Sequence, residues 1–213
     1  MTCGVLITFS GVDGAGKTTL LREVKRELEL RLDSPLIELR QRPSILPILS
    51  SFKHGKKAAE ENAANNKPRM GLNNSIITSF FRFLYYFSDY FFGQWVVYFK
   101  YQRKGYNVLY DRYYYDFIAD PKRANLRLSR GFALFMFKFV FTPKINFFLY
   151  ANPKTILSRK MELSEYEILE LTENYGGLFQ ELSDKNSEKF ISINNEKKSK
   201  SLDRILATII ENL

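Results

Sequence analysis

Short apolar runs alternate along this chain with longer segments whose apolar residues recur at helical spacing. We predict a strand at each of five apolar runs: Val5–Phe9, Leu36–Leu39, Asn107–Tyr110, Ile145–Tyr150 and Phe190–Ile193. Helical segments lie between most of them. Strands that alternate with helices favour a parallel sheet with right-handed crossovers. The pattern therefore predicts an α/β fold, a five-stranded parallel sheet flanked by helices.

The helical segments differ in length and composition. Lys17–Leu32 places its leucines and Val24 on one face with charges between them. Further helices are predicted at Ser75–Lys104, across most of Pro153–Leu182, and at Ser199–Leu213. Residues 41–74 are interrupted by proline and then polar, which predicts a loop. With no repeat and no linker rich enough to divide the chain, we expect one domain over residues 1–213.

Composition indicates a globular protein but does not identify its binding partner. The 213 residues are 45% hydrophobic and 26% charged, as in a globular protein, and the net charge is +9. A basic surface attracts nucleic acid, anionic membranes and phosphorylated small molecules alike. No nucleic-acid module is present, so we expect no nucleic-acid partner. The single cysteine, Cys3, fits a reducing compartment, and we expect a cytoplasmic protein.

The segment Ser75–Lys104 is dense in phenylalanine and tyrosine, which together make the aromatic content unusual. Arg82 and Asp89 lie inside it, and a charge near the centre of a bilayer is costly. We interpret the segment as a core helix beside the sheet and expect no membrane partner. Association with a membrane surface is the alternative that this pattern leaves open.

The strongest chemical signal is a glycine-rich loop between the first strand and the first helix. Residues 11–18 read Gly-Val-Asp-Gly-Ala-Gly-Lys-Thr, which matches the pattern G-x-x-x-x-G-K-[ST] in full. Glycines let the backbone N–H groups turn onto phosphate oxygens, and the helix N-terminus adds positive potential. Lys17 would reach the β- and γ-phosphates of ATP, and the Thr18 hydroxyl would bind Mg²⁺. The motif predicts an ATP-dependent phosphotransferase.

A second metal ligand is expected at the end of a neighbouring strand. Asp111 follows the apolar run Val108–Tyr110, at the carboxyl edge where open α/β sheets bind their ligands. A carboxylate there normally holds Mg²⁺ through water. The alternative is an aspartate that only caps a turn.

Together these residues resemble the thymidylate kinase family of P-loop nucleoside monophosphate kinases. The likeness is carried by the phosphate loop through Thr19, by Asp111-Arg112-Tyr113, and by Pro143–Pro153 with Arg159. It runs in order along most of the chain. The resemblance implies the P-loop nucleotide kinase fold, ATP as donor with Mg²⁺, and a homodimer packed through helices.

The resemblance also implies roles for individual residues. Arg112 would bridge the donor and acceptor phosphates, Asp13 would touch the acceptor sugar, and Arg159 would cover the nucleotide from a lid. The loop at Asn194 and Asn195 would lie near the adenine. The expected ATP-binding residues are Gly11, Asp13, Gly14, Ala15, Gly16, Lys17, Thr18, Thr19 and Arg159. The expected catalytic residues are Lys17, Asp111, Arg112 and Asp116, and the expected acceptor-binding residues are Asp13, Arg42, Arg82, Arg112 and Arg123.

The acceptor site departs from the family pattern. The family has Arg-Glu-Pro after its second strand, whereas this chain has Gln41-Arg42-Pro43. Asp89 is followed by Tyr90 instead of arginine, and the segment after Lys160 is acidic instead of arginine-rich. Arg123, Arg127 and Arg130 could replace the missing cations, or they could form a solvated basic face.

Asp116, where the family usually has serine, bears on the chemistry. If the segment is helical, Arg112, Asp116 and Asp120 share one face. Asp116 could accept a proton from a hydroxyl acceptor, or it could only orient Arg112. Transfer onto a phosphate needs no base, because its attacking oxygen is already anionic.

Three functions are compatible with these patterns. The first is transfer of a phosphoryl group from ATP to dTMP, giving ADP and dTDP. The second is phosphoryl transfer by the same fold to another acceptor, such as a sugar hydroxyl in nucleotide-sugar or surface-glycan metabolism. The third is a nucleotide-binding protein without turnover, against which the intact Lys17, Thr18, Asp111 and Arg112 argue.

Overall fold

The computed structural model of the chain describes residues 3–32, 34–43, 46, 75–185 and 187–213. It contains one five-stranded parallel sheet in the order β2-β3-β1-β4-β5. The strands are β1 (Leu6–Gly11), β2 (Leu36–Arg40), β3 (Asn107–Asp111), β4 (Ile145–Tyr150) and β5 (Lys189–Asn194). All five predicted strands are confirmed, with small shifts at their ends. That residues 1–213 form one domain stays a prediction.

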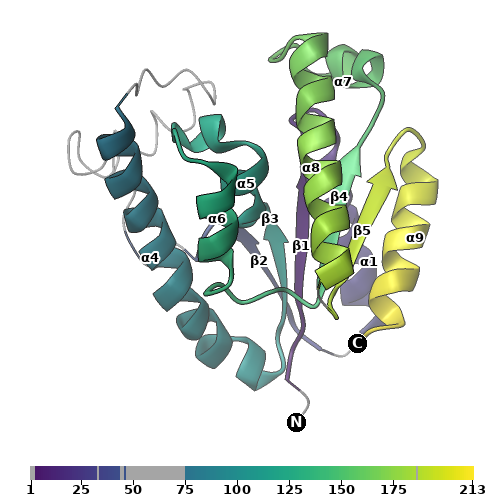
Figure 1. Ribbon diagram of the computed structural model, residues 1–213. Coiled ribbons are helices and arrows are strands. Elements are labelled where there is room, and N and C mark those ends of the chain that lie inside the picture. The colour runs from purple at the N-terminus through teal and green to yellow at the C-terminus, as the bar shows by residue number, and fades with distance from the viewer. Residues whose placement is uncertain (1–2, 33, 44–45, 47–74, 186) are drawn as a thin grey trace, which may run out of the picture.

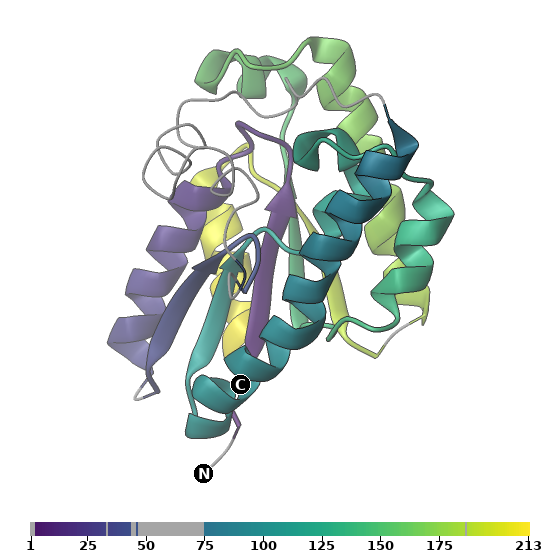
Figure 2. The ribbon, with the colours of Figure 1, turned by 90° about the vertical axis from the view of Figure 1, so that its left-hand side faces the viewer.

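Helices cover both faces of this sheet (Figure 1). They are α1 (Lys17–Arg31), α4 (Ile76–Lys100), α5 (Tyr115–Ala119), α6 (Arg130–Phe137), α7 (Pro153–Arg159), α8 (Glu165–Lys185) and α9 (Lys198–Ile210), with 3₁₀ turns η1 (Gln102–Lys104) and η2 (Pro121–Ala124). Helices α1 and α9 lie on one face, and α4, α5, α6 and α8 lie on the other (Figure 2). The phosphate loop and α7 lie at the carboxyl edge of the strands.

Alternation along the strands divides the core into two parts. Ile7 and Phe9 of β1 pack with α1 and α9 in a largely aliphatic cluster. Leu6 packs on the other side, where the cluster is rich in tyrosine and phenylalanine. Successive side chains of a strand point to opposite faces, so one strand serves both clusters. Much of the unusual aromatic content therefore fills the second cluster.

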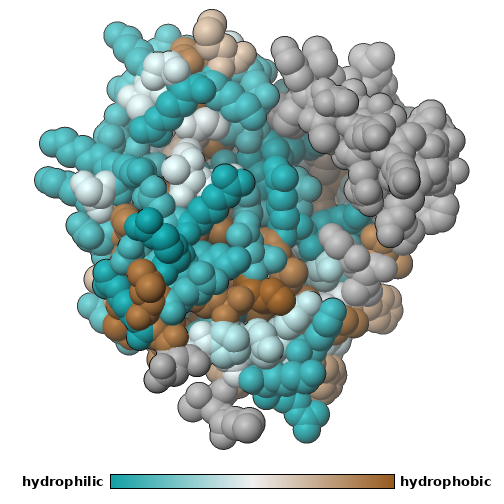
Figure 3. Space-filling view, turned by 180° about the vertical axis from the view of Figure 1, so that it is seen from behind, coloured by the Kyte–Doolittle hydropathy of each residue, from teal (hydrophilic) through white to brown (hydrophobic). Residues whose placement is uncertain are grey.

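The predicted face of the first helix is confirmed. Leu20, Leu21, Val24 and Leu28 are buried, and Leu32 caps the helix end through its N–H to the Leu28 carbonyl. Full burial of a leucine contributes about 2 kcal/mol, so this stripe does much to hold α1 on the sheet. Seen from behind, hydrophilic side chains cover most of the upper left of the surface, and hydrophobic ones gather below them (Figure 3).

Two long predicted helices are shorter in the structure. The segment Ser75–Lys104 is helical only to Lys100, because the chain turns through η1 into Gly105, whose φ is 84°. Pro153–Leu182 divides into α7 and α8. Ser164 and Glu167 form a reciprocal capping box that starts α8 anew. Most of the predicted loop 41–74 lies outside the described residues.

No helix among the described residues is long and apolar enough to cross a bilayer. Of the apolar segment 131–141, only the part up to Phe137 belongs to α6, and Tyr115–Ala119 forms α5. Cys3 is a free, exposed cysteine.

Candidate active site

The loop between β1 and α1 has the backbone that a phosphate site requires. Gly16 caps the helix N-terminus in the left-handed region, with φ 87°. A Cβ on Gly16 would lie 2.6 Å from Asn195 Nδ2, so a larger residue would push the side chain of Asn195 away. Asn195 Nδ2 donates to the Ala15 carbonyl at 2.8 Å, and Arg159 Nη2 donates to the Asn195 carbonyl at 3.2 Å. The loop is thus held in place from the β5 and α7 side, where Arg159 and Asn195 meet it.

Lys17 is buried at the start of α1, with its ammonium inside the loop. Its Nζ donates to the Val12 carbonyl at 2.7 Å. Burial, with the positive charge of Arg112 acting in the same direction, lowers the pKa of Lys17 to about 7. An anion bound in the loop would offset both effects, so the site is suited to a group that carries negative charge.

Thr18 and Asp111 meet across the sheet edge, at the ends of elements that are far apart in sequence. Thr18 Oγ1 donates to Asp111 Oδ2 at 3.0 Å. The other carboxylate oxygen, Oδ1, is buried and has no hydrogen-bond partner among the described residues. A hydroxyl and a carboxylate with a free oxygen are oxygen ligands of the kind that Mg²⁺ takes. These two residues fit the metal that the sequence predicts.

Arg112 follows Asp111 and lies between the phosphate loop and the residues beyond it. Its φ of 77° is in the left-handed region, which arginine rarely adopts. Strained backbone of this kind is concentrated at functional sites. Nη1 donates to the Gly11 carbonyl at 3.3 Å and to Asp116 Oδ2 at 3.0 Å, and Nη2 pairs with Asp13. The guanidinium therefore contacts both sides of the site at once.

Asp13 and Asp116 hold two arginines between them. Asp13 pairs with both Arg112 and Arg123, and Arg123 Nε lies 3.9 Å from Asp116 Oδ2. Burial would raise the pKa of Asp13, but Arg112, Lys17 and Arg123 outweigh it and hold that pKa well below its usual range. Burial disfavours the charged form of Arg112 and would lower its pKa, yet the negative charges of Asp116 and Asp13 raise that pKa above the ordinary value. Asp13 and Arg112 therefore stay ionised near neutral pH.

The predicted contact of Arg112 with Asp116 is present, but a shared helix does not produce it. Helix α5 begins only at Tyr115, and Arg112 has a left-handed backbone. Asp120 ends that helix with φ −140°, so the condition of our expectation, one helix that carries all three residues, is not met. A five-residue helix is too short to carry them all.

Tyr175 of α8 completes the surroundings of Asp116. Its hydroxyl donates to Asp116 Oδ1 at 2.8 Å. Burial and the nearby charge of Asp116 raise the pKa of Tyr175 well above its usual value, so it remains a donor. Both carboxylate oxygens of Asp116 are thus engaged, one by Tyr175 and one by Arg112.

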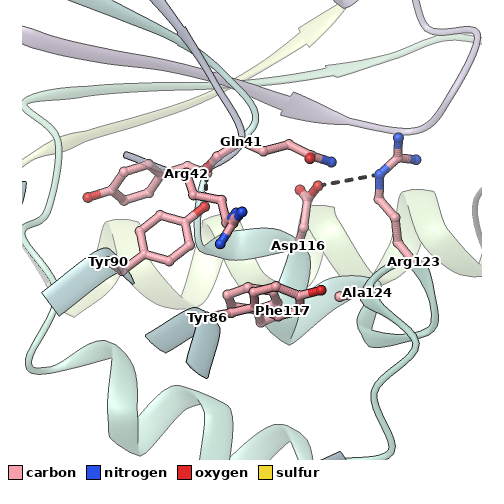
Figure 4. A pocket seen from close by; sticks show the side chains of 9 residues that line it. Gln41, Arg42, Tyr86, Tyr90, Asp116, Phe117, Arg123 and Ala124 are labelled. Carbon is pink, nitrogen blue, oxygen red and sulfur yellow. Dashed lines mark hydrogen bonds and ion pairs between the residues drawn. The ribbon is translucent and has the colours of Figure 1, made fainter. Parts of the chain in front are cut away.

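Beside this cluster lies a pocket of about 200 Å³, which we call the aromatic pocket (Figure 4). Asp116 and Arg123 face each other at its wall, with Gln41 and Arg42 reaching in from the end of β2. Tyr86 and Phe117 stack with ring centroids 6.0 Å apart. The lining residues are Gln41, Arg42, Tyr86, Tyr90, Tyr113, Asp116, Phe117, Arg123 and Ala124.

The polar groups of the aromatic pocket are mostly satisfied by the protein itself. Tyr90 OH donates to the Gln41 carbonyl, and Tyr113 OH donates to the Phe141 carbonyl at 2.6 Å. Arg42 pairs with the buried Asp89 at 3.0 Å and lies 5.1 Å from the Tyr86 ring centroid. The wall of the pocket is therefore composed of aromatic rings and of arginines that already have carboxylate partners.

The other predicted acceptor arginine, Arg82, does not line the aromatic pocket. It lies one turn before Tyr86 on α4. Arg127 and Arg130 also lie outside the pocket wall, and Arg130 pairs with Glu181 at 2.5 Å. Of the arginines considered for an acceptor, the structure brings Arg42, Arg112 and Arg123 together.

No protein-family model matches the chain, and no curated protein matches it in sequence. Among solved structures, it is similar to the thymidylate kinase from Ehrlichia chaffeensis, with a TM-score of 0.62 and 14% identity over 98% of this chain and 99% of that chain. The fold is that of thymidylate kinase. At this identity the similarity shows the P-loop nucleotide kinase fold alone.

Several residues of the site were missed by sequence reasoning. Tyr175 is an ordinary core position of α8 in the sequence, and only the packing of α8 against α5 brings it to Asp116. Tyr86 and Phe117 belong to aromatic runs in which no single ring stands out. Tyr90 could have been found from the sequence, because it follows Asp89 at the position where the thymidylate kinase family has arginine.

Proposed function

We propose that this chain is an ATP- and Mg²⁺-dependent kinase that phosphorylates a nucleoside monophosphate, with dTMP as the first acceptor. The position of Arg112 carries the proposal, because its guanidinium contacts the Gly11 carbonyl of the phosphate loop and the Asp116 carboxylate of the aromatic pocket. A phosphoryl group that leaves the loop would meet an acceptor in that pocket. The fold shared with a thymidylate kinase supports the same conclusion.

The proposed roles follow the contacts. Lys17 binds the terminal phosphates of ATP, while Thr18 and Asp111 hold Mg²⁺, which neutralises charge on the phosphates. Arg112 stabilises the transferred group, with the acceptor phosphate near Arg42 and Arg123. The bond from the γ-phosphorus to the bridging oxygen breaks and its electron pair leaves with ADP. A new bond forms from the acceptor phosphate oxygen, and no proton has to move.

The aromatic walls suit a flat acceptor group. Tyr86 and Phe117 lie nearly parallel, at 11°, and expose ring surface to the pocket. The hydroxyls of Tyr90 and Tyr113 already donate to backbone carbonyls, so they add few free donors to the wall. We propose that a base or another planar group lies against these rings, and that Arg42 and Gln41 supply its polar contacts. A role for Arg82 in acceptor binding stays a prediction.

A second candidate is a kinase for a hydroxyl acceptor, such as the sugar hydroxyl of a nucleotide-sugar. One observation favours it: Arg42, Arg112 and Arg123 each already have a carboxylate partner. Three cations balanced by Asp13, Asp89 and Asp116 suit an acceptor with less negative charge. In this reaction Asp116 would accept the hydroxyl proton.

The deciding experiment is a panel of acceptors with ADP formation as the readout. The purified chain is incubated with ATP and Mg²⁺ together with dTMP, other nucleoside monophosphates or uncharged sugars and nucleosides, and phosphorus NMR identifies the product. Turnover of dTMP at ordinary kinase rates, about 1–100 per second, supports the first candidate and rejects the second. Turnover confined to hydroxyl acceptors supports the second candidate and rejects the first. ATP binding without ADP formation for any acceptor would support the third function, a nucleotide-binding protein without turnover.

A further inference from the structure

The chain that follows β5 is held at the carboxyl edge of the sheet by three neighbouring elements. Asn195, the first residue after β5, donates its N–H to the Tyr150 carbonyl of β4 at 2.7 Å. The carbonyl of Asn195 accepts a hydrogen bond from Arg159 Nη2 of α7 at 3.2 Å. The Ser201 hydroxyl of α9 donates to the Asn194 carbonyl at 3.1 Å. The backbone at Asn195 is therefore fixed from three sides, which limits where its side chain can point.

The side chain of Asn195 reaches the phosphate loop. It is only 3% exposed, and its Nδ2 donates to the Ala15 carbonyl at 2.8 Å. The other amide atom, Oδ1, is buried and has no hydrogen-bond partner among the described residues. Burying an unpaired oxygen is unfavourable, and an apolar side chain of the same size would fill the space without that cost. Packing alone therefore does not account for asparagine at this position, whereas the hydrogen bond from Nδ2 does.

This hydrogen bond also orients the next N–H group along the chain. In a trans peptide the C=O and the N–H point in opposite directions. Because Asn195 holds the Ala15 C=O, the N–H of Gly16 in the same peptide points away from Asn195. Within the part of the chain that the structure describes, no group accepts a hydrogen bond from that N–H. It is a free donor inside the motif that cradles phosphates.

Glycine at position 16 makes this orientation open to change. Its φ is 87°, in the left-handed region, and glycine populates positive and negative φ about equally readily. If nothing held the Ala15 carbonyl, the peptide between Ala15 and Gly16 could rotate and carry the Gly16 N–H out of the loop. The hydrogen bond from Asn195 favours one of the two orientations before any ligand arrives.

We propose that Asn195 is a positioning residue of the donor site, which keeps the Gly16 N–H directed at a phosphate oxygen of a bound nucleoside di- or triphosphate. Asn195 does not touch the nucleotide in this role, because it acts through the peptide between Ala15 and Gly16. The inference rests on the ATP-binding part of the proposed function and needs no acceptor. The resemblance places Asn195 near the adenine, and its hydrogen bond to Ala15 adds a role at the phosphates.

The sequence allows the Gly16 amide to be observed alone. Ala15-Gly16 is the only alanine-glycine pair in the chain. Full-length protein labelled with ¹³C at the alanine carbonyls and ¹⁵N at glycine therefore gives a single peak in an NMR spectrum that correlates each carbonyl carbon with the amide that follows it. When Mg²⁺ and ADP are added to the wild type, we expect this amide proton to move downfield, because its N–H then donates to a charged phosphate oxygen.

Variants of Asn195 separate the hydrogen bond from packing. Asn195→Leu has a similar volume but no donor, so the downfield shift should be lost and the affinity for ADP, measured by calorimetry, should fall about tenfold. Asn195→Ala should give the same result. If the leucine variant does not fold, Asn195→Asp, which has the same size and also lacks the donor, takes its place. Circular dichroism establishes that each variant is folded.

The matched control is another asparagine that donates to a backbone carbonyl. Asn212 Nδ2 donates to the Thr208 carbonyl at 2.6 Å, near the end of the chain and away from the phosphate loop. Asn212→Leu removes the same kind of hydrogen bond. It should leave the shift of the Gly16 amide and the affinity for ADP as they are in the wild type.

Two results would overturn the role of Asn195 and leave the proposed function standing. One is an ADP-induced shift and an affinity in Asn195→Leu that equal those of the wild type. The other is a loss in Asn195→Ala that is absent in Asn195→Leu, because that would show that Asn195 only fills space. A wild-type Gly16 amide that does not respond to ADP is a different outcome, since it would refute the phosphate-loop site and the proposed function together.

Discussion

The phosphate loop and the aromatic pocket lie on either side of Arg112, and the chain builds them in different ways. The loop is one continuous segment, and its backbone carbonyls accept hydrogen bonds from the side chains of Lys17 and Asn195. The pocket draws residues from the end of β2, from α4, from α5 and from η2. The phosphate loop can be recognised from a short sequence motif, whereas the residues of the aromatic pocket come together only when the chain folds.

The two regions also differ in charge. Lys17 has a lowered pKa in a loop that is suited to an anion. In the pocket, by contrast, arginines and carboxylates already neutralise one another. Changes in the loop should therefore remove activity with every acceptor, while changes in the pocket should alter how one acceptor is used.

The largest effect is expected for Lys17→Ala. This variant removes the cation nearest the transferred group, and we expect kcat to fall by about a thousandfold with any acceptor. ADP formation measures the loss. Lys25→Ala, on the same helix but at the partly exposed pair with Glu38, should keep the wild-type rate. Full activity in Lys17→Ala would refute the phosphate-loop assignment.

Asp111→Asn should lower the rate by about a hundredfold at low Mg²⁺, because it weakens one of the two proposed metal ligands. Excess Mg²⁺ should recover part of the loss, so the measurement is the rate as a function of metal concentration. Asp203→Asn changes an exposed carboxylate on α9 and serves as the control. A Mg²⁺ dependence identical to that of the wild type would remove Asp111 from the metal site.

Arg123→Met tests the pocket side. Arg123 pairs with Asp13 and lines the pocket, so its loss should raise the KM for the acceptor by about thirtyfold and leave the KM for ATP nearly unchanged. Lys122→Met removes the exposed cation next to it on the same 3₁₀ turn and should change neither constant. If both KM values rose together, Arg123 would belong to the loop and not to the pocket.

The difference between a loop made of one segment and a pocket made of several explains which parts of the protein could be predicted from sequence. The strands and α1 were predictable, because short apolar runs and the spacing of Leu20, Leu21, Val24 and Leu28 reflect local geometry. Thr18 and Asp111 were found from a motif and a strand end. The structure places them in direct contact at 3.0 Å, and their binding of Mg²⁺ stays a prediction.

The pocket was predicted only in part. Arg42 and Arg123 were chosen for their charge, but their pairing with Asp89 and Asp13 depends on contacts between distant segments. Tyr175 is 59 residues from Asp116, and no local pattern connects them. The break after Arg159 was missed although Ser164 and Glu167 have the spacing of a capping box, which is a sequence signal for the start of a helix.

A smaller effect concerns the pH dependence of ATP binding. Because the pKa of Lys17 is about 7 in the free loop and bound phosphate would raise it, the charged form favours binding. Affinity should be full below pH 7 and fall as pH rises, by about tenfold near pH 8. Calorimetry in buffers of different ionisation enthalpy would detect the proton taken up. Lys17→Arg, which stays protonated, should flatten the profile, and an unchanged slope there would exclude Lys17 as the titrating group.

The smallest effect is expected for Tyr175→Phe, and it bears on how Asp116 acts. Removing the hydroxyl frees Asp116 Oδ1 and loosens the carboxylate that orients Arg112. A lost hydrogen bond of about 1 kcal/mol corresponds to roughly fivefold in kcat, with little change in the KM for ATP. Tyr166→Phe, on an exposed tyrosine of the same helix, is the matched control. If Asp116 is instead the base for a hydroxyl acceptor, the variant should also shift the acid limb of the pH–rate profile, because the hydrogen bond that stabilises the ionised carboxylate is gone. A fall in kcat without that shift therefore assigns Asp116 to positioning, and a shift assigns it to proton transfer.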